Sequence, residues 1–116
     1  MYILTQPGKL YRLWQPATTS ATGKQAIPGA AIYSVVCAGC HDTGANAAPM
    51  LSQPQQWQAI LNQSADITHA HVINGYRAMP ERGLCFQCTD DELIATTEYM
   101  LEQVMQTARD TDASRQ

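Results

Sequence analysis

The chain has 116 residues, of which 45% are hydrophobic and 15% charged, and a formal net charge of −3 at pH 7. This length allows one domain at most, and the hydrophobic content excludes a wholly disordered chain. The acidic balance argues against nucleic-acid binding, which selects basic surfaces, and no run approaches the roughly 18 apolar residues of a membrane span. Because so small a core is marginal by apolar burial alone, covalent or cofactor stapling is expected.

Residues 1–26 are predicted to form an N-terminal tail or linker. The stretch from Gln15 to Gly23 is small, polar and aperiodic, which suits a flexible linker. The apolar residues at its beginning could dock on the domain or tether it to a partner. No secretory signal is visible, because residues 1–14 include Lys9 and Arg12 but no continuous apolar segment.

A helix is predicted to open the compact part of the chain, which is expected to span residues 27–106. Pro28 suits a first helical turn, and the apolar residues through Val36 suit a helix that ends at the motif that follows.

The motif Cys37-Ala38-Gly39-Cys40-His41 has the C-x-x-C-H spacing that attaches a c-type haem. Two intervening residues place the thiols about one helical turn apart, within reach of two vinyl groups of the porphyrin. His41 then lies against one face of the ring as an axial ligand. A bare C-x-x-C would equally suit a disulfide, half a zinc site or a redox dithiol, but the adjacent histidine favours one covalently bound haem c.

Further short helices are predicted after a loop of small residues that ends at Pro49. One begins at Gln53-Pro54 and includes Trp57, and another spans Ile67 to Asn74, with Gly75 stopping it. No alternating strand pattern occurs. We therefore expect an all-α fold of about four short helices wrapped round the haem.

The last helix has the best-specified start. Thr89-Asp90-Asp91-Glu92 is a capping box, in which the acids also complement the helix dipole. Apolar residues then recur at helical spacing. After Gln106 the chain turns polar, and residues 107–116 are expected to be a frayed tail.

The second axial position decides what the haem can do. The candidate ligands are Met50, Met79, Met100, Met105, His69 and His71. Met100 and Met105 lie on the apolar face of the last helix, where methionine is usually core filler, and Met50 follows His41 too closely to cross the ring. The histidines lie on a short helix, where surface or hydrogen-bonding roles are commoner.

Met79 is the predicted ligand, because Gly75 and Pro80 bracket an irregular loop and Pro80 holds Met79 extended. A thioether raises the potential relative to a second histidine. Six-coordinate iron has no site for substrate, which leaves one-electron transfer. If Met79 does not ligate, the alternative is a five-coordinate haem sensor or enzyme.

The second cysteine pair, Cys85 and Cys88, is followed by Thr89 and so is no second haem site. The four cysteines could instead form a zinc or iron–sulfur site. The long separation from Cys40 to Cys85 disfavours that reading and leaves His41 unexplained. A thioredoxin-like dithiol requires a βαβ context that the sequence lacks.

Basic residues are scarce in the compact part. Between residues 28 and 106 they are Arg77 and Arg82, on either side of Met79, against eight acids. One interpretation places the two cations near the iron and the haem propionates. The other is that they are ordinary solvated loop residues.

The combined motifs resemble those of the bacterial cytochrome c5 family over about residues 28–106. The residues that carry the resemblance are Cys37 to His41, Ala48-Pro49, Trp57, Asn74-Gly75-Tyr76, Ala78-Met79-Pro80, Gly83, Cys85-x-x-Cys88, Thr89 to Leu93 and Tyr99-Met100. The resemblance implies a class I cytochrome c fold with His41 and Met79 as axial ligands and a disulfide between Cys85 and Cys88.

The same resemblance implies further residues around the haem. The Pro49 carbonyl would orient the His41 imidazole, and Trp57 would lie near the haem. Arg77 is also expected in the haem surroundings, from its position beside Met79 and not from the resemblance. The family usually has a basic residue a few positions after its tryptophan, whereas Gln58-Ala59-Ile60 follows here. Gly29 and Tyr33 would meet Tyr99 where the first and last helices cross.

The predicted function is that of an electron carrier without substrate turnover. It would pass single electrons between redox protein partners, a donor and an acceptor such as an oxidase or reductase. Covalent haem and a disulfide indicate an oxidising compartment, the periplasm. The alternative is an electron-entry haem domain of a larger or tethered redox enzyme, the tether being the N-terminal segment.

Overall fold

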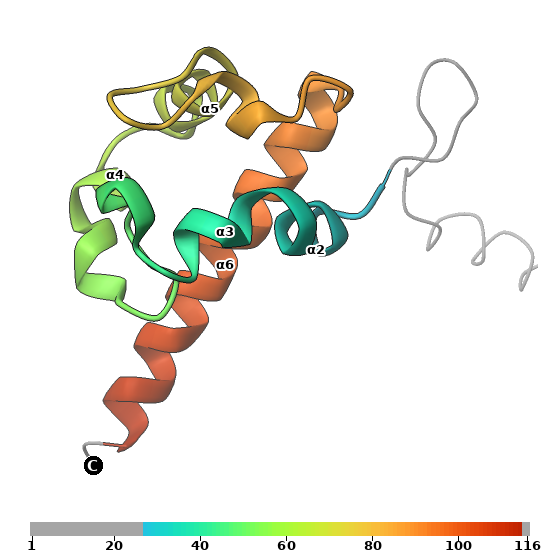
Figure 1. Cartoon of the computed structure of the whole chain (residues 1–116). Coiled ribbons are helices and arrows are strands. Elements are labelled where there is room, and N and C mark those ends of the chain that lie inside the picture. The colour runs from blue at the N-terminus through green and yellow to red at the C-terminus, as the bar shows by residue number, and fades with distance from the viewer. Residues whose placement is uncertain (1–26, 115–116) are drawn as a thin grey trace, which may run out of the picture.

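The computed structural model describes residues 27–114, and its regular structure is helical (Figure 1). Within this range no strand occurs, and a single isolated bridge joins Tyr76 to Met79. The predicted all-α class is confirmed. The predicted tail at residues 1–26 lies outside the described residues. The elements are α2 (Gly29–Ile32), η2 (Tyr33–Cys37), α3 (Ala38–His41), η3 (Ala45–Ala47), η4 (Pro54–Trp57), α4 (Gln58–Asn62), α5 (Ala65–Asn74), η5 (Glu81–Leu84) and α6 (Asp90–Ser114).

The first helix passes through the cysteine motif instead of ending where it begins. Helical backbone is continuous from α2 through η2 and α3 to His41, and η2 is a stretch of π-helix. Pro28 lies just before the first turn, and its carbonyl accepts bonds from the N–H groups of Ala31 and Ile32. Short π segments are rare and often occur at functional sites. The run therefore delivers Cys37, Cys40 and His41 on one helical support.

Helix α5 begins two residues earlier than the predicted Ile67. Ser64 explains the difference, because its side chain accepts a hydrogen bond from the Ile67 N–H and caps the helix. At the other end, the Gly75 N–H donates to the His71 carbonyl at 2.9 Å. Gly75 has φ +88°, and a Cβ there would lie 2.9 Å from the Glu81 nitrogen. Only glycine allows this close approach between the end of α5 and the segment after Met79.

Helix α6 starts at the predicted capping box, which is confirmed. The Glu92 N–H donates to Thr89 Oγ1 at 3.0 Å, and the Thr89 N–H donates to Glu92 Oε1 at 2.9 Å. The helix continues to Ser114, whereas the sequence predicted fraying after Gln106. Side chains one turn apart link this end, since Gln106 donates to Asp110 Oδ1 at 3.0 Å. Extending a formed helix also costs far less than nucleating one.

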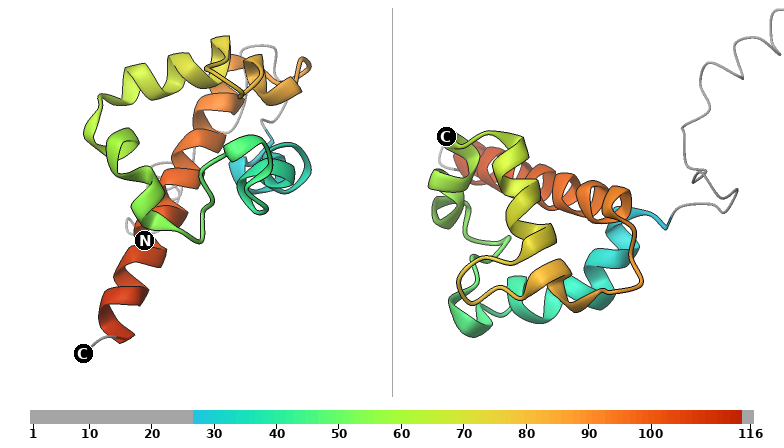
Figure 2. Two further views of the ribbon diagram at one scale, coloured as in Figure 1. Left: turned by 60° about the vertical axis from the view of Figure 1, so that its left-hand side comes forward. Right: turned by 90° about the horizontal axis from the view of Figure 1, so that it is seen from above.

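Helices α2, α5 and η4 pack against α6, the longest element in both views of Figure 2. At the crossing of α2 and α6, a Cβ on Gly29 would lie 2.8 Å from the Ala95 carbonyl oxygen, so the two backbones are in near contact. Further along, the rings of Tyr33 and Tyr99 lie 5.8 Å apart. The buried side chains form two hydrophobic clusters. One contains Ile32, Cys85, Cys88 and Leu93, and the other contains Tyr33, Trp57, Met100 and Val104.

Candidate haem-binding site

His41, the last residue of α3, is buried, and its ring is fixed by the loop that follows. Its Nδ1 lies 2.7 Å from the carbonyl oxygen of Pro49, and its own carbonyl accepts the Leu51 N–H at 3.0 Å. Because a carbonyl only accepts, Nδ1 carries the proton. No further hydrogen bond of this imidazole occurs among residues 27–114. Nε2 is thus the nitrogen left for a metal.

Trp57 supports the same loop from its buried position at the end of η4. Its indole N–H donates to the Met50 carbonyl at 2.8 Å, one residue after Pro49. The centres of the Trp57 and His41 rings are 5.7 Å apart. The tryptophan therefore fixes the backbone that orients the histidine.

Tyr33 adds a contact that sequence patterns did not reveal. Its hydroxyl donates to Asp42 Oδ1, on the residue after His41. Burial, followed by the hydrogen bond and the charge of Asp42, raises the pKa of Tyr33 well above its ordinary value. The tyrosine is thus a neutral donor that ties the end of α3 to η2.

Cys37 and Cys40 are both partly exposed, and neither forms a disulfide. Burial, with a smaller contribution from Cys40, raises the pKa of the Cys37 thiol to about 11. The thiol is therefore protonated at neutral pH. Both sulfurs come from the helical run that ends in His41.

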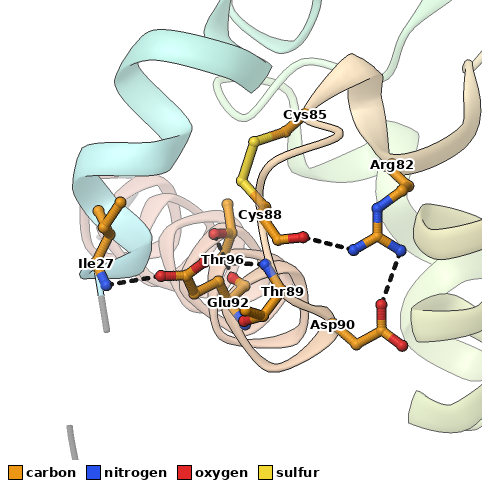
Figure 3. The surroundings of a disulfide bond; sticks show 8 residues. All are labelled: Ile27, Arg82, Cys85, Cys88, Thr89, Asp90, Glu92 and Thr96. Carbon is orange, nitrogen blue, oxygen red and sulfur yellow. Dashed lines mark hydrogen bonds and ion pairs between the residues drawn. A yellow bond between two sulfur atoms is a disulfide. The ribbon is translucent and has the colours of Figure 1, made fainter. Parts of the chain in front are cut away.

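Cys85 and Cys88 are buried and bonded to each other, with their Cα atoms 5.5 Å apart (Figure 3). This pairing removes two thiols from the four-cysteine metal site considered above. No group of three or more His, Cys, Asp or Glu residues within 27–114 is placed to hold a metal ion by itself. The geometry thus disfavours the zinc and iron–sulfur alternatives.

Met79 closes a tight turn between α5 and η5. The Tyr76 N–H donates to the Met79 carbonyl at 3.0 Å, and the Met79 N–H donates to the Tyr76 carbonyl at 2.9 Å. The side chain is partly buried, and η5, which begins two residues later, packs against η2. The fold therefore brings the methionine segment to the helix that carries Cys37.

The other candidate ligands have different surroundings. His69 Nε2 lies 2.7 Å from Glu98 Oε2, which links α5 to α6. The His71 ring stacks on that of Tyr76, with the ring centres 3.8 Å apart. Met100 belongs to the buried core, and Met105 is exposed on α6.

The two arginines that flank Met79 differ from each other. Arg82 Nη2 donates to the Cys88 carbonyl at 2.6 Å, and Nη1 donates to Asp90 Oδ1 at 2.7 Å (Figure 3). The guanidinium of Arg82 therefore faces the disulfide turn and the first residue of α6. Arg77 is exposed, with Cζ 5.0 Å from the centre of the Tyr76 ring.

These residues fit a covalently attached haem. Two unpaired thiols precede a histidine with one nitrogen already hydrogen-bonded, and a thioether-bearing loop packs against the same helix. That donor set is the one expected for a c-type haem.

Residues 24–100 match the family described as "Cytochrome C oxidase, cbb3-type, subunit III". A cytochrome c5 from Azotobacter vinelandii is 35% identical over 80 residues, which cover 67% of this chain and 96% of that protein. The chain belongs to the cytochrome c5 family of class I c-type cytochromes. The resemblance predicted from the sequence is confirmed.

Other similar proteins agree with this membership. A cytochrome c5 from Ectopseudomonas mendocina is 34% identical over 66 residues, covering 55% of this chain and 76% of that protein. A cytochrome c-555 from Chlorobaculum thiosulfatiphilum is 30% identical over 82 residues, covering 67% and 95%. A chain from the crystal structure of an electron transfer complex of nitrite reductase with cytochrome c superposes with a TM-score of 0.62, at 36% identity, covering 66% of this chain and 93% of that one.

This member of the cytochrome c5 family is a small electron-transfer protein that carries one covalently bound haem c. Like its relatives, it is an electron carrier and not an enzyme. Among the described residues, no helix has the length and apolar character needed to cross a membrane.

Proposed function

We propose that Cys37 and Cys40 hold the haem as thioethers and that His41 and Met79 are its axial ligands. The observation that carries this proposal is the His41 imidazole, which has Nδ1 2.7 Å from the Pro49 carbonyl and directly follows two unpaired thiols. A haem held in this way supplies a single electron by cycling between ferric and ferrous iron. The thioether of Met79 favours the ferrous form relative to a second histidine.

The protein's own groups hold the iron's surroundings constant while the electron passes. The Pro49 carbonyl keeps one orientation of His41, and the Tyr76 turn keeps one orientation of Met79. With His41 and Met79 both holding the iron, no open position would remain for a substrate. Electron transfer then requires little rearrangement.

We further propose that the carrier works in the periplasm and delivers electrons to a redox enzyme. A disulfide and a covalent haem both require an oxidising compartment. The similar cytochrome c chain in complex with nitrite reductase makes a reductase one acceptor class. Recovery of the haem-loaded protein in the osmotic-shock fraction supports this location, and recovery with the cytoplasm contradicts it.

The proposed docking surface consists of exposed apolar side chains on η2 and on the segment from Leu84 to Phe86. Val35 on η2 is 84% exposed, and Leu84 and Phe86 are 64% and 62% exposed. Because η2 and η5 pack together, these side chains come from adjoining segments. Arg77, two residues before Met79, is exposed and is the cation proposed to accompany this surface.

A second candidate is the electron-entry domain of a larger redox enzyme. The match of residues 24–100 to an oxidase subunit family favours it. Haem-containing protein that copurifies with a membrane oxidase would support this candidate. Free haem protein that shuttles electrons to a separately purified acceptor would support the carrier.

A redox-titrated visible spectrum, measured on protein made in a host that matures c-type haem, tests the proposed ligation. We expect a single one-electron wave, a far-red methionine-to-iron charge-transfer band in the oxidised form, and no binding of carbon monoxide to the ferrous form. Ready carbon monoxide binding without the far-red band would instead indicate a five-coordinate sensor or enzyme.

A further inference from the structure

Arg82 connects the segment after Met79 to the start of α6. Its side chain is 20% exposed, and it bonds the Cys88 carbonyl through Nη2 and Asp90 through Nη1. Figure 3 shows the guanidinium bonded to both of these acceptors. One side chain thus joins η5, the disulfide turn and the first residue of α6.

The backbone that carries Arg82 adopts a conformation that two of its residues disfavour. Arg82, Gly83 and Leu84 have φ values of 57°, 56° and 71°, all in the left-handed region. For residues with a side chain this conformation is energetically unfavourable. Such a run persists only where surrounding contacts enforce it, and the two bonds of Arg82 are contacts of that kind.

The conformation of η5 in turn determines what lies against Met79. Gly83 lies alongside the end of the methionine side chain, since a Cβ at Gly83 would be at ordinary van der Waals distance from Met79 Cε, 4.0 Å, and from Val36 Cγ1, 3.8 Å. On its other side, Met79 is held by the paired backbone bonds to Tyr76. If η5 relaxed, the methyl group of Met79 would lose this support.

We propose that Arg82 is a positioning residue for Met79, which it keeps on the haem iron by holding η5 in its left-handed run. This inference rests on the proposed ligation by Met79. It assigns Arg82 a role that an ordinary surface ion pair lacks, since exposed pairs contribute little to stability. The geometry also requires arginine, because a lysine ammonium is a point charge without the planar fork.

The test measures how readily the iron–sulfur bond opens. Imidazole is titrated into the oxidised haem-loaded protein, and loss of the far-red band is followed in the wild type, Arg82→Gln and Arg82→Lys. Arg109→Gln is the matched control, because Arg109 also bonds a neighbouring side chain, Gln106 at 2.8 Å, but lies near the far end of α6. We expect the half-displacing imidazole concentration to fall about tenfold in Arg82→Gln, less in Arg82→Lys, and not in Arg109→Gln.

An unchanged imidazole midpoint in Arg82→Gln would overturn the inference while leaving ligation by Met79 intact. Absence of the far-red band from the wild type would overturn both. Should Arg82→Gln fail to accumulate, Asp90→Ala removes one of the two acceptors. A smaller fall of the midpoint in this variant supports the inference, and a wild-type midpoint contradicts it.

Discussion

The carbonyl oxygen of Pro49 lies 2.7 Å from Nδ1 of His41, at the end of a loop that returns to the helix from which it came. The orientation of His41 is therefore set by the backbone at Pro49, and by the contacts that hold this backbone in place. Trp57 does so through its bond to the adjacent Met50 carbonyl.

Trp57→Phe tests this support. The substitution keeps an aromatic ring but leaves the Met50 carbonyl without its donor, so we expect a loss of about 1–3 kcal/mol in the free energy of unfolding. Urea unfolding followed by helical circular dichroism measures it. Gln58→Ala, at an exposed neighbouring position, is the control and should change stability little.

Gly29→Ala tests the crossing of α2 and α6. The added methyl would lie 2.8 Å from the Ala95 carbonyl oxygen and 3.0 Å from Thr96 Cα, so the helices must separate. We expect a cost of about 1–3 kcal/mol in thermal or urea unfolding. Gly39→Ala is the matched control, because a Cβ at Gly39 meets no atom within 4 Å. Equal destabilisation by the two substitutions would contradict the close contact.

Glu92→Gln tests how the free energy of unfolding depends on pH in the acidic range. Hydrogen bonds from the N–H of Ile27 and then from that of Thr89 hold the pKa of Glu92 below its ordinary value (Figure 3). A carboxyl group whose pKa is lowered by folding stabilises the protein at pH values above its pKa in the unfolded chain, about 4.3. This stabilisation is lost as the pH falls through the pKa of the folded protein.

The glutamine variant should therefore be less stable at pH 7, with a shallower decline below about pH 4.3. Urea unfolding at several pH values measures both effects. Asp91→Asn is the control, since Asp91 is an exposed carboxylate on the same first turn and accepts no hydrogen bond within residues 27–114. A decline in Glu92→Gln as steep as that of the wild type would count against this assignment.

Electron transfer to a partner should depend weakly on salt. Of the two basic residues between 28 and 106, Arg82 is paired with Asp90, which leaves Arg77 to interact with a partner. Steering by complementary charge is then small. Stopped-flow oxidation by a purified redox partner should change less than about threefold between ~10 mM and ~500 mM salt. A steep fall would indicate charge-steered docking instead.

Features with local chemical signatures were predictable from the sequence. In the capping box, Thr89 and Glu92 exchange hydrogen bonds between side chain and backbone three residues apart, and the structure shows both bonds. The start of α5 was missed because Ser64 precedes small and polar residues, so the apolar pattern becomes visible only at Ile67. The C-terminal part of α6 was missed because its residues are mostly polar and so show no periodic apolar pattern. Such residues can still extend a helix that has already formed.

Features that depend on backbone conformation could not be predicted from residue types. The role of Arg82 follows from positive φ values at residues 82–84, two of which are not glycine. The contact of Tyr33 with Asp42 spans the π-helical stretch, and no residue pattern predicts that stretch. In both cases tertiary packing overrides the local preference.

The far-red absorption of the oxidised haem-loaded protein tests the central claim most directly. Ligation by Met79 predicts a charge-transfer band that Met79→Ala abolishes, with conversion of the iron to high spin and a lower potential. Met50→Ala, which removes a rejected candidate, should keep the band. A band that survives Met79→Ala, or one lost in Met50→Ala, would show that another residue holds the second axial position.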